Sequence, residues 1–168
     1  MSPITKLSQY SPTFGLLLSV AYSLHRKYQT QRKLIRIKNK TAYDNHFIRN
    51  VMAFVRPPNI NDFHFTIKYG KTFSGFYYLH FNRIWVSLGK ASYPCLRNEE
   101  PRKGGHIQNI LILSEEEYLM FLTAHELFHL FLRNTKRPQS ENACDAYALR
   151  KMREYRKLTS SDFYPNNV

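Results

Sequence analysis

Two histidines and a glutamate have the types and the spacing that a catalytic zinc site needs. They belong to the run His125-Glu126-Leu127-Phe128-His129. Residues four apart on a helix lie one above the other, so His125 and His129 can both direct an imidazole nitrogen at one ion. Glu126 is offset by about 100° around the helix, where its carboxylate can approach a metal-activated water without being a ligand. The motif therefore indicates hydrolysis at a bound metal.

The residues around this motif predict the helix that must present it. Ser114 is followed by three glutamates, which is the pattern of an N-cap with an acidic first turn, and Glu117 completes a capping box. Apolar side chains that can bury the helix follow at Leu119, Leu122, Leu127, Leu130 and Phe131. We expect the helix to begin at Ser114 and to continue through the motif.

A catalytic zinc ion keeps three protein ligands and one position for water, so the two histidines need a third partner. No histidine follows His129, and the remaining candidates are Glu141, Cys144, Asp145, Glu154 and Asp162. Residues 134–138 predict a break, after which Ser140 can cap a second helix. Glu141 and Asp145 then share a face. One carboxylate can bind the ion while the other accepts a hydrogen bond from the ring N–H of a ligating histidine.

The pattern H-E-x-x-H followed by E-x-x-x-D resembles that of the gluzincin metallopeptidases. The short spacing, with Tyr147 and Ala148 after the aspartate, is similar to small ImmA/IrrE-like peptidases and minigluzincins of prokaryotes and phages. The resemblance covers roughly residues 76–155 and is specific at 125–148. It implies that His125, His129 and Glu141 bind Zn²⁺, that Asp145 orients the first histidine, and that Glu126 is catalytic.

This chain departs from the family pattern at two places. Cys144 replaces the small residue that commonly precedes the aspartate, and the segment after Ala148 is basic. Cys144 is either a small buried thiol or a ligand that replaces Glu141. His106, shortly before the motif helix, is a further candidate that could donate to a transition state, although a histidine at the end of a loop is more often solvated.

The rest of the chain predicts one α+β domain of 168 residues with a zincin-like fold. Helical periodicity covers residues 12–38 and 41–55, and period-two alternation covers 63–69, 84–88 and 106–113, with a hairpin arm at 76–80. We expect N-terminal helices at 1–58, a small, mainly antiparallel sheet backed by the N-terminal helix at 62–113, and the active-site and glutamate helices at 114–157. Residues 90–105 predict a long basic loop that could overhang the cleft.

The net charge is the second strong signal. The chain has 25 Lys and Arg against 12 Asp and Glu, a formal net charge of +13. The basic residues gather in the first 43 residues and in 133–157, which indicates an anionic partner such as nucleic acid; a solvated basic surface is the alternative. The two cysteines suggest a reduced, cytoplasmic protein. The apolar run at 14–24 is too short for a transmembrane segment and makes a weak signal peptide, so secretion is the less favoured location.

Together these features predict a zinc-dependent endopeptidase that hydrolyses peptide bonds of a protein or peptide substrate through a metal-activated water. The alternative is a basic, nucleic-acid-binding accessory protein with a structural or vestigial zinc site. Glu126 favours the enzyme, because a purely structural site has no need of that carboxylate.

Overall fold

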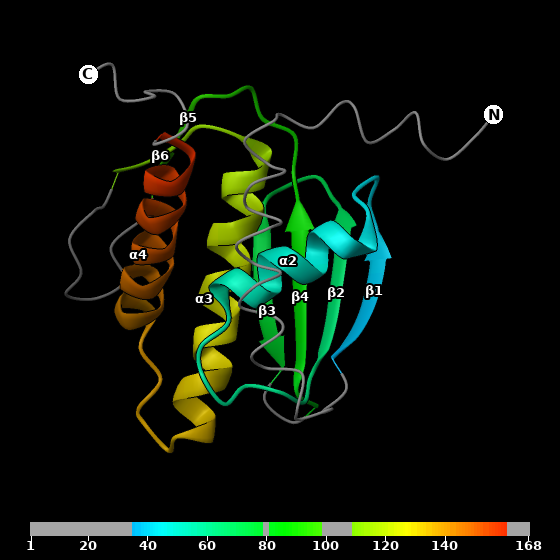
Figure 1. The fold of residues 1–168 in the computed structure, drawn as a ribbon, viewed down its shortest axis with the longest axis vertical. Helices are drawn as coiled ribbons and strands as arrows, with labels where there is room; N and C mark the ends of the chain where they lie inside the picture. Colours follow the sequence, from blue (N-terminus) through cyan, green and yellow to red (C-terminus); the bar gives the residue numbers. More distant parts are fainter. Residues whose placement is uncertain (1–34, 79–80, 99–108, 161–168) are drawn as a thin grey trace, which may run out of the picture.

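The computed structural model describes residues 35–78, 81–98 and 109–160, which form a mixed α/β protein with a small sheet (Figure 1). In chain order the elements are β1 Arg36–Lys40, α2 Asn45–Val55, β2 His64–Tyr69, β3 Ser74–Tyr78, β4 Arg83–Leu88, β5 Cys95–Asn98, β6 Asn109–Ile112, α3 Glu115–Asn134 and α4 Glu141–Ser160. The predicted combination of helices with a small sheet is confirmed. Most of the predicted helix at 12–38 and the candidate His106 lie outside the described residues.

The main sheet has the strand order β1-β2-β4-β3. β1 runs parallel to β2, and β2 runs parallel to β4, whereas β3 is antiparallel to β4 and forms an edge of the sheet. The predicted hairpin is thus confirmed for residues 76–78, which lie in β3 and pair antiparallel with β4, while residues 79–80 lie outside the described residues. The prediction of a mainly antiparallel sheet is wrong. The connection through α2 makes β2 parallel to β1, and β4 then lies between β2 and β3. Alternation of side chains has the same period in both strand directions and cannot reveal this.

The predicted first helix is wrong at its end, because Arg36–Lys40 is strand β1. Arg36, Lys38 and Lys40 are exposed, while Ile37 and Asn39 between them are half-buried. This two-residue period is that of an edge strand. The pairing of β1 with β2, with Ile37 opposite Phe65, determines the local structure. Local periodicity could not predict that long-range pairing.

The predicted single loop at 90–105 is also wrong, because it contains strand β5. β5 pairs antiparallel with β6, with Leu96 opposite Leu111, and the two form a ribbon separate from the main sheet. Ile110 and Ile112 of β6 are buried. The apolar alternation of residues 109–112 therefore correctly predicts a strand, but this strand does not join the sheet predicted for 62–113.

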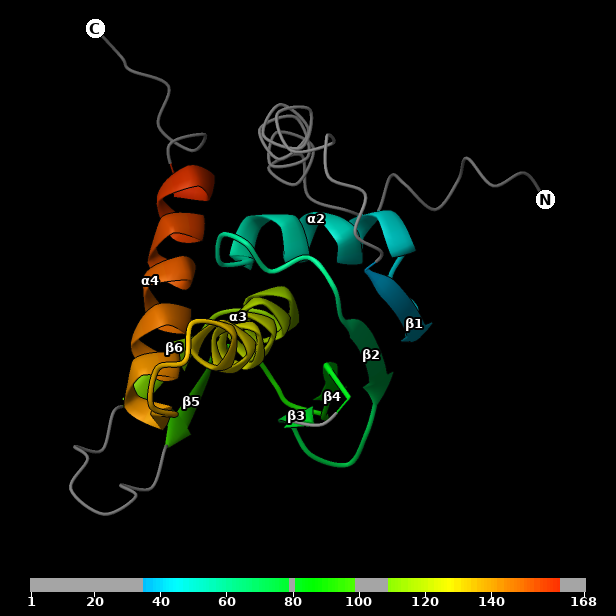
Figure 2. The same cartoon turned by 90° about the horizontal axis from the view of Figure 1, so that it is seen from below.

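Helix α3 lies between the main sheet and α4 (Figure 2). The hydroxyl of Ser114 accepts a hydrogen bond from the backbone N–H of Glu117 at 3.3 Å, which confirms the predicted N-cap. Phe121, Leu127 and Leu130 are fully buried in the core that α3 shares with α2 and the sheet. Burial on both sides fixes the axis of α3, so its motif has a defined position.

Two polar contacts fix α4 against the rest of the fold. Arg156 pairs with the buried carboxylate of Glu117 on α3 at 2.7 Å, and the hydroxyl of Tyr147 donates to the carbonyl of Val55 at 2.8 Å. One contact ties α4 to α3 and the other ties it to α2. The first turn of α4 therefore has a fixed place beside the motif. Within the described ranges, no helix has both the length and the apolar character required to cross a membrane.

Candidate metal centre

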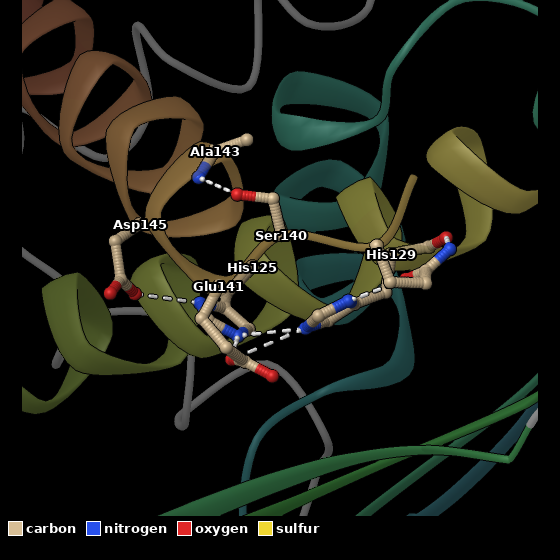
Figure 3. A network of polar contacts seen from close by, with 7 residues as sticks. His125, His129, Ser140, Glu141, Ala143 and Asp145 are labelled. Atoms are coloured by element: carbon tan, nitrogen blue, oxygen red, sulfur yellow. Dashed lines mark hydrogen bonds and ion pairs between the residues drawn. The ribbon is translucent and has the colours of Figure 1, made fainter. Parts of the chain in front are cut away.

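The two histidines of α3 converge on one point. His125 and His129 are one turn apart, and the side chain of each is 12% exposed. Their Nε2 atoms lie 3.1 Å apart (Figure 3). The predicted i,i+4 placement is therefore present, and both side chains are mostly buried but retain some exposure to solvent.

The first turn of α4 brings Glu141 to the same point. The backbone N–H of Ala143 donates to the hydroxyl of Ser140 at 3.3 Å, so Ser140 caps this helix as predicted. Oε2 of Glu141 lies 3.2 Å from Nε2 of His125 and 3.5 Å from Nε2 of His129. Ligand atoms around a tetrahedral zinc ion with bonds of about 2.0–2.1 Å are about 3.3–3.4 Å apart. The three atoms thus have the spacing that one such ion requires.

The other ring nitrogen of each histidine, Nδ1, is hydrogen-bonded to a neighbouring side chain (Figure 3). Nδ1 of His125 lies 2.8 Å from Oδ1 of Asp145, and Nδ1 of His129 lies 2.9 Å from Oε1 of Gln139. Carboxylate and amide oxygens only accept, so Nδ1 is the donor in both rings. Each ring is therefore oriented with Nε2 toward the common point, which is the arrangement that supports a metal-bound histidine.

His125 has an unusual charge balance in the metal-free protein. Burial disfavours its charged form, but hydrogen bonds to Asp145 and Glu141 and the charge of Glu126 outweigh burial and raise the pKa of His125 to about 9. The proton on Nε2 of His125 is then donated in a hydrogen bond to the carboxylate of Glu141, at the point where a metal cation would lie. Binding of a metal must displace this proton.

This displacement predicts a pH-dependent affinity for zinc. The apparent affinity should rise about ten-fold per pH unit between about pH 7 and the His125 pKa of about 9, and then level off. The metal-free protein should change in the opposite sense. A folded-state pKa raised above 6.5 gives stability that is complete below pH 6.5 and is lost as the pH rises through about 9. Competition titrations of zinc against a chelating dye, and thermal unfolding of the metal-free protein, would test the two parts. An affinity that does not change with pH would contradict the His125 protonation.

Cys144 is a second candidate for the third ligand. It is fully buried, and its sulfur lies within 4.8 Å of the histidine ligand atoms, so His125, His129 and Cys144 could together hold a metal ion. Burial, and then the charges of Glu141 and Glu126, raise the pKa of the Cys144 thiol well above its usual range. A protonated thiol is a poor ligand, because the thiolate is the form that binds metals. The protonated state of the thiol favours Glu141, whose Oε2 lies 3.2 and 3.5 Å from the two Nε2 atoms.

Glu126 is buried at 5% exposure between α3 and the edge strand β3. A Cβ atom on Gly75 of β3 would collide with its carboxylate. Glycine at this position therefore lets the strand approach the carboxylate closely. The Glu126 carboxylate therefore belongs to the same turn of α3 as His125, but it is directed toward strand β3 of the sheet.

The fold thus brings together six of the predicted site residues: His125, Glu126, His129, Glu141, Cys144 and Asp145. Sequence reasoning missed Gln139 and Gly75. Gln139 lies in the turn before α4, and Gly75 lies in a strand whose position beside α3 could not be predicted, so each acts through a contact that no local pattern records. Only the run of α3 and the first turn of α4 could be found from spacing.

The fold and the site define a mixed α/β protein with a cluster of side chains that could hold a metal ion. No protein-family model, no curated protein and no solved structure matches this chain.

Proposed function

We propose that this protein is a zinc-dependent endopeptidase of the gluzincin type, with His125, His129 and Glu141 as the ligands. The converging Nε2 atoms, the tetrahedral spacing of the Glu141 oxygen and the outward hydrogen bonds to Asp145 and Gln139 support this ligand set. The ligand types support zinc, since two imidazoles and a carboxylate that leave one position open are typical of its catalytic sites.

The observation on which the enzymatic proposal rests is the position of Glu126. A structural zinc site is closed by four protein ligands and needs no additional carboxylate. Here a buried carboxylate follows the first ligand directly and lies against the backbone of the edge strand β3. Burying a charged carboxylate costs free energy. Its retention beside the histidines is explained by a role in proton transfer.

The chain's own groups divide the chemistry of peptide hydrolysis as follows. A bound zinc ion would supply a Lewis acid that lowers the pKa of water to about 7 and polarises a carbonyl. The Glu126 carboxylate accepts a proton from the attacking water and then donates it to the nitrogen of the leaving amine. Asp145 holds His125 in one tautomer, and Gln139 does the same for His129. Proton movement is thus confined to Glu126.

Removal of the metal tests this proposal. The purified protein should contain about one zinc ion per chain and should cleave an unfolded protein such as casein. Incubation with a strong chelator should abolish cleavage, and added zinc should restore it. A zinc-loaded protein that cleaves no peptide bond in a broad set of unfolded substrates would contradict the enzymatic proposal and leave a structural site.

Gly75→Ala provides a test that depends on the β3 contact. The new methyl group would collide with the side chain of Glu126, which supplies its three nearest atoms, and would displace the carboxylate. We expect cleavage to fall by roughly 100-fold, the scale of a lost general base, while zinc content stays unchanged. The control is Ser74→Ala, the neighbouring residue whose side chain has the opposite orientation in the strand. Full activity in Gly75→Ala would show that the carboxylate can work from another position.

A further inference from the structure

The main sheet has two faces of different character. Phe65, Ile67, Ile84 and Val86 are buried under α2 and α3, which lie on the same side of the sheet (Figure 2). The alternate residues of each strand point to the other side, which no described helix covers. We call this second surface the outer face of the sheet.

The outer face is basic. Arg36, Lys38 and Lys40 lie along β1, Lys68 lies on β2 and Arg83 on β4. The registers place Lys40 beside Lys68, and His64 between Arg36 and Arg83. The outward positions of these four strands include no acidic residue. The cations therefore form a positive surface, and within the part of the chain that the structure describes no ion pair joins any of them to a carboxylate.

Aromatic rings lie next to these cations. Phe76, Tyr78 and Trp85 are outward on β3 and β4 and are 57%, 44% and 38% exposed. Phe76 is directly opposite Trp85, and the ring of Tyr78 meets that of Trp85 edge-on at 6.0 Å. The ammonium of Lys68 lies 5.1 Å from the centre of the Trp85 ring. This is a cluster of exposed rings with a cation already stacked on it.

We propose that the outer face binds single-stranded nucleic acid. The cations of β1 and β2 pair with phosphates, and the rings of β3 and β4 stack on unpaired bases, which present a π-face whatever their identity. β1 and β3 lie roughly 14 Å apart across three strand spacings of about 4.8 Å. The surface therefore has a phosphate-binding side and a base-stacking side on one rigid sheet.

The composition of the face distinguishes this partner from others. Every apolar residue in an outward position of the four strands is aromatic, and none is aliphatic. A membrane or a hydrophobic protein surface would be matched by aliphatic side chains as well, whereas bases are matched by rings. A second copy of the chain would meet like charge on this face. The positive charge and exposed rings together fit a polyanion with exposed bases.

The single tryptophan of the chain is on this face, so its fluorescence reports binding directly. The full-length, zinc-loaded protein should be titrated with oligouridine and oligothymidine of roughly 12 nucleotides, within the usual range of site sizes, and with a duplex of equal length. We expect both single strands to quench Trp85 and to bind at least ten-fold more tightly than the duplex. The stronger of the two would identify RNA or DNA as the source. The logarithm of the binding constant should fall linearly with the logarithm of the salt concentration, with a slope of about −0.7 per phosphate contact.

Three variants separate stacking from charge. Phe76→Ala should weaken binding roughly ten-fold and leave the salt slope unchanged. Joint replacement of Lys38 and Lys40 by Glu should flatten the slope. The matched control replaces Arg153 and Lys157 by Glu, an equal change of charge at exposed positions of α4, and it should bind as wild type. Zinc content and circular dichroism should be the same for all.

Several results would overturn the proposal. These are a duplex bound as tightly as single strands, an unchanged Trp85 signal, a control pair that weakens binding as much as the β1 pair, or binding to phosphatidylserine vesicles without binding to oligonucleotides. None of these results bears on the zinc site, because the outer face faces away from α3. Failure here would therefore be distinct from failure of the peptidase proposal.

Discussion

Glu126→Gln should retain zinc and the fold while losing peptidase activity. Glutamine has the size and shape of glutamate, so it can occupy the same buried space between α3 and β3. It cannot accept a proton from the attacking water or return one to the leaving amine. General acid–base catalysis contributes roughly 10²- to 10⁴-fold, so the cleavage rate should fall by about that factor. Cleavage of casein, zinc analysis and thermal unfolding measure the three properties.

The control for this prediction is Glu154→Gln on α4. Glu154 makes ion pairs with Lys151 and Arg150 at the surface, and its charge is the same as that of Glu126. Surface pairs of this kind contribute little to stability, about 0–1 kcal/mol, and we expect activity and zinc content as in wild type. Wild-type cleavage by Glu126→Gln would refute the assignment of Glu126 as the proton carrier, whatever the zinc content.

The parts that could be predicted from the sequence depend on local interactions. Ser114 and Ser140 cap their helices through hydrogen bonds to residues three positions later, so each cap is recorded within four residues. The i,i+4 relation of His125 to His129 and of Glu141 to Asp145 is set by helix geometry alone. Once two capped helices are joined by a short turn, their facing residues have few ways to meet. The convergence of these side chains thus followed from local rules.

The errors concern relations between distant segments. The helical spacing of apolar residues that ends at Ile35 predicts a helix through residue 38, but the pairing of β1 with β2 decides the structure. The insertion of β4 between β2 and β3 cannot be inferred from alternation, which is the same in parallel and antiparallel strands. Gly75 is important only because β3 is the strand that lies beside Glu126. Its role could not be predicted before the strand order was known.

The choice between Glu141 and Cys144 as third ligand has the second large expected effect. Glu141→Ala removes the oxygen at 3.2 and 3.5 Å from the two Nε2 atoms. Loss of a residue that only orients a ligand costs roughly 10- to 100-fold in metal affinity, and loss of the ligand itself should cost more. We expect Glu141→Ala to be purified without zinc. Cys144→Ala should retain one zinc ion and lose stability by about 1 kcal/mol, because a small buried group is removed.

Substitution of cobalt for zinc gives a second readout that does not depend on affinity. A thiolate bound to cobalt produces an intense charge-transfer absorption in the near ultraviolet, and a carboxylate does not. With Glu141 as ligand, wild-type protein should lack this band, and Cys144→Ala should give the same spectrum as wild type. A band that is present in wild type and lost in Cys144→Ala would assign the third position to the thiol. Glu141 would then be a half-exposed carboxylate beside the ion. Metal binding would have to deprotonate Cys144, even though burial raises the pKa of its thiol.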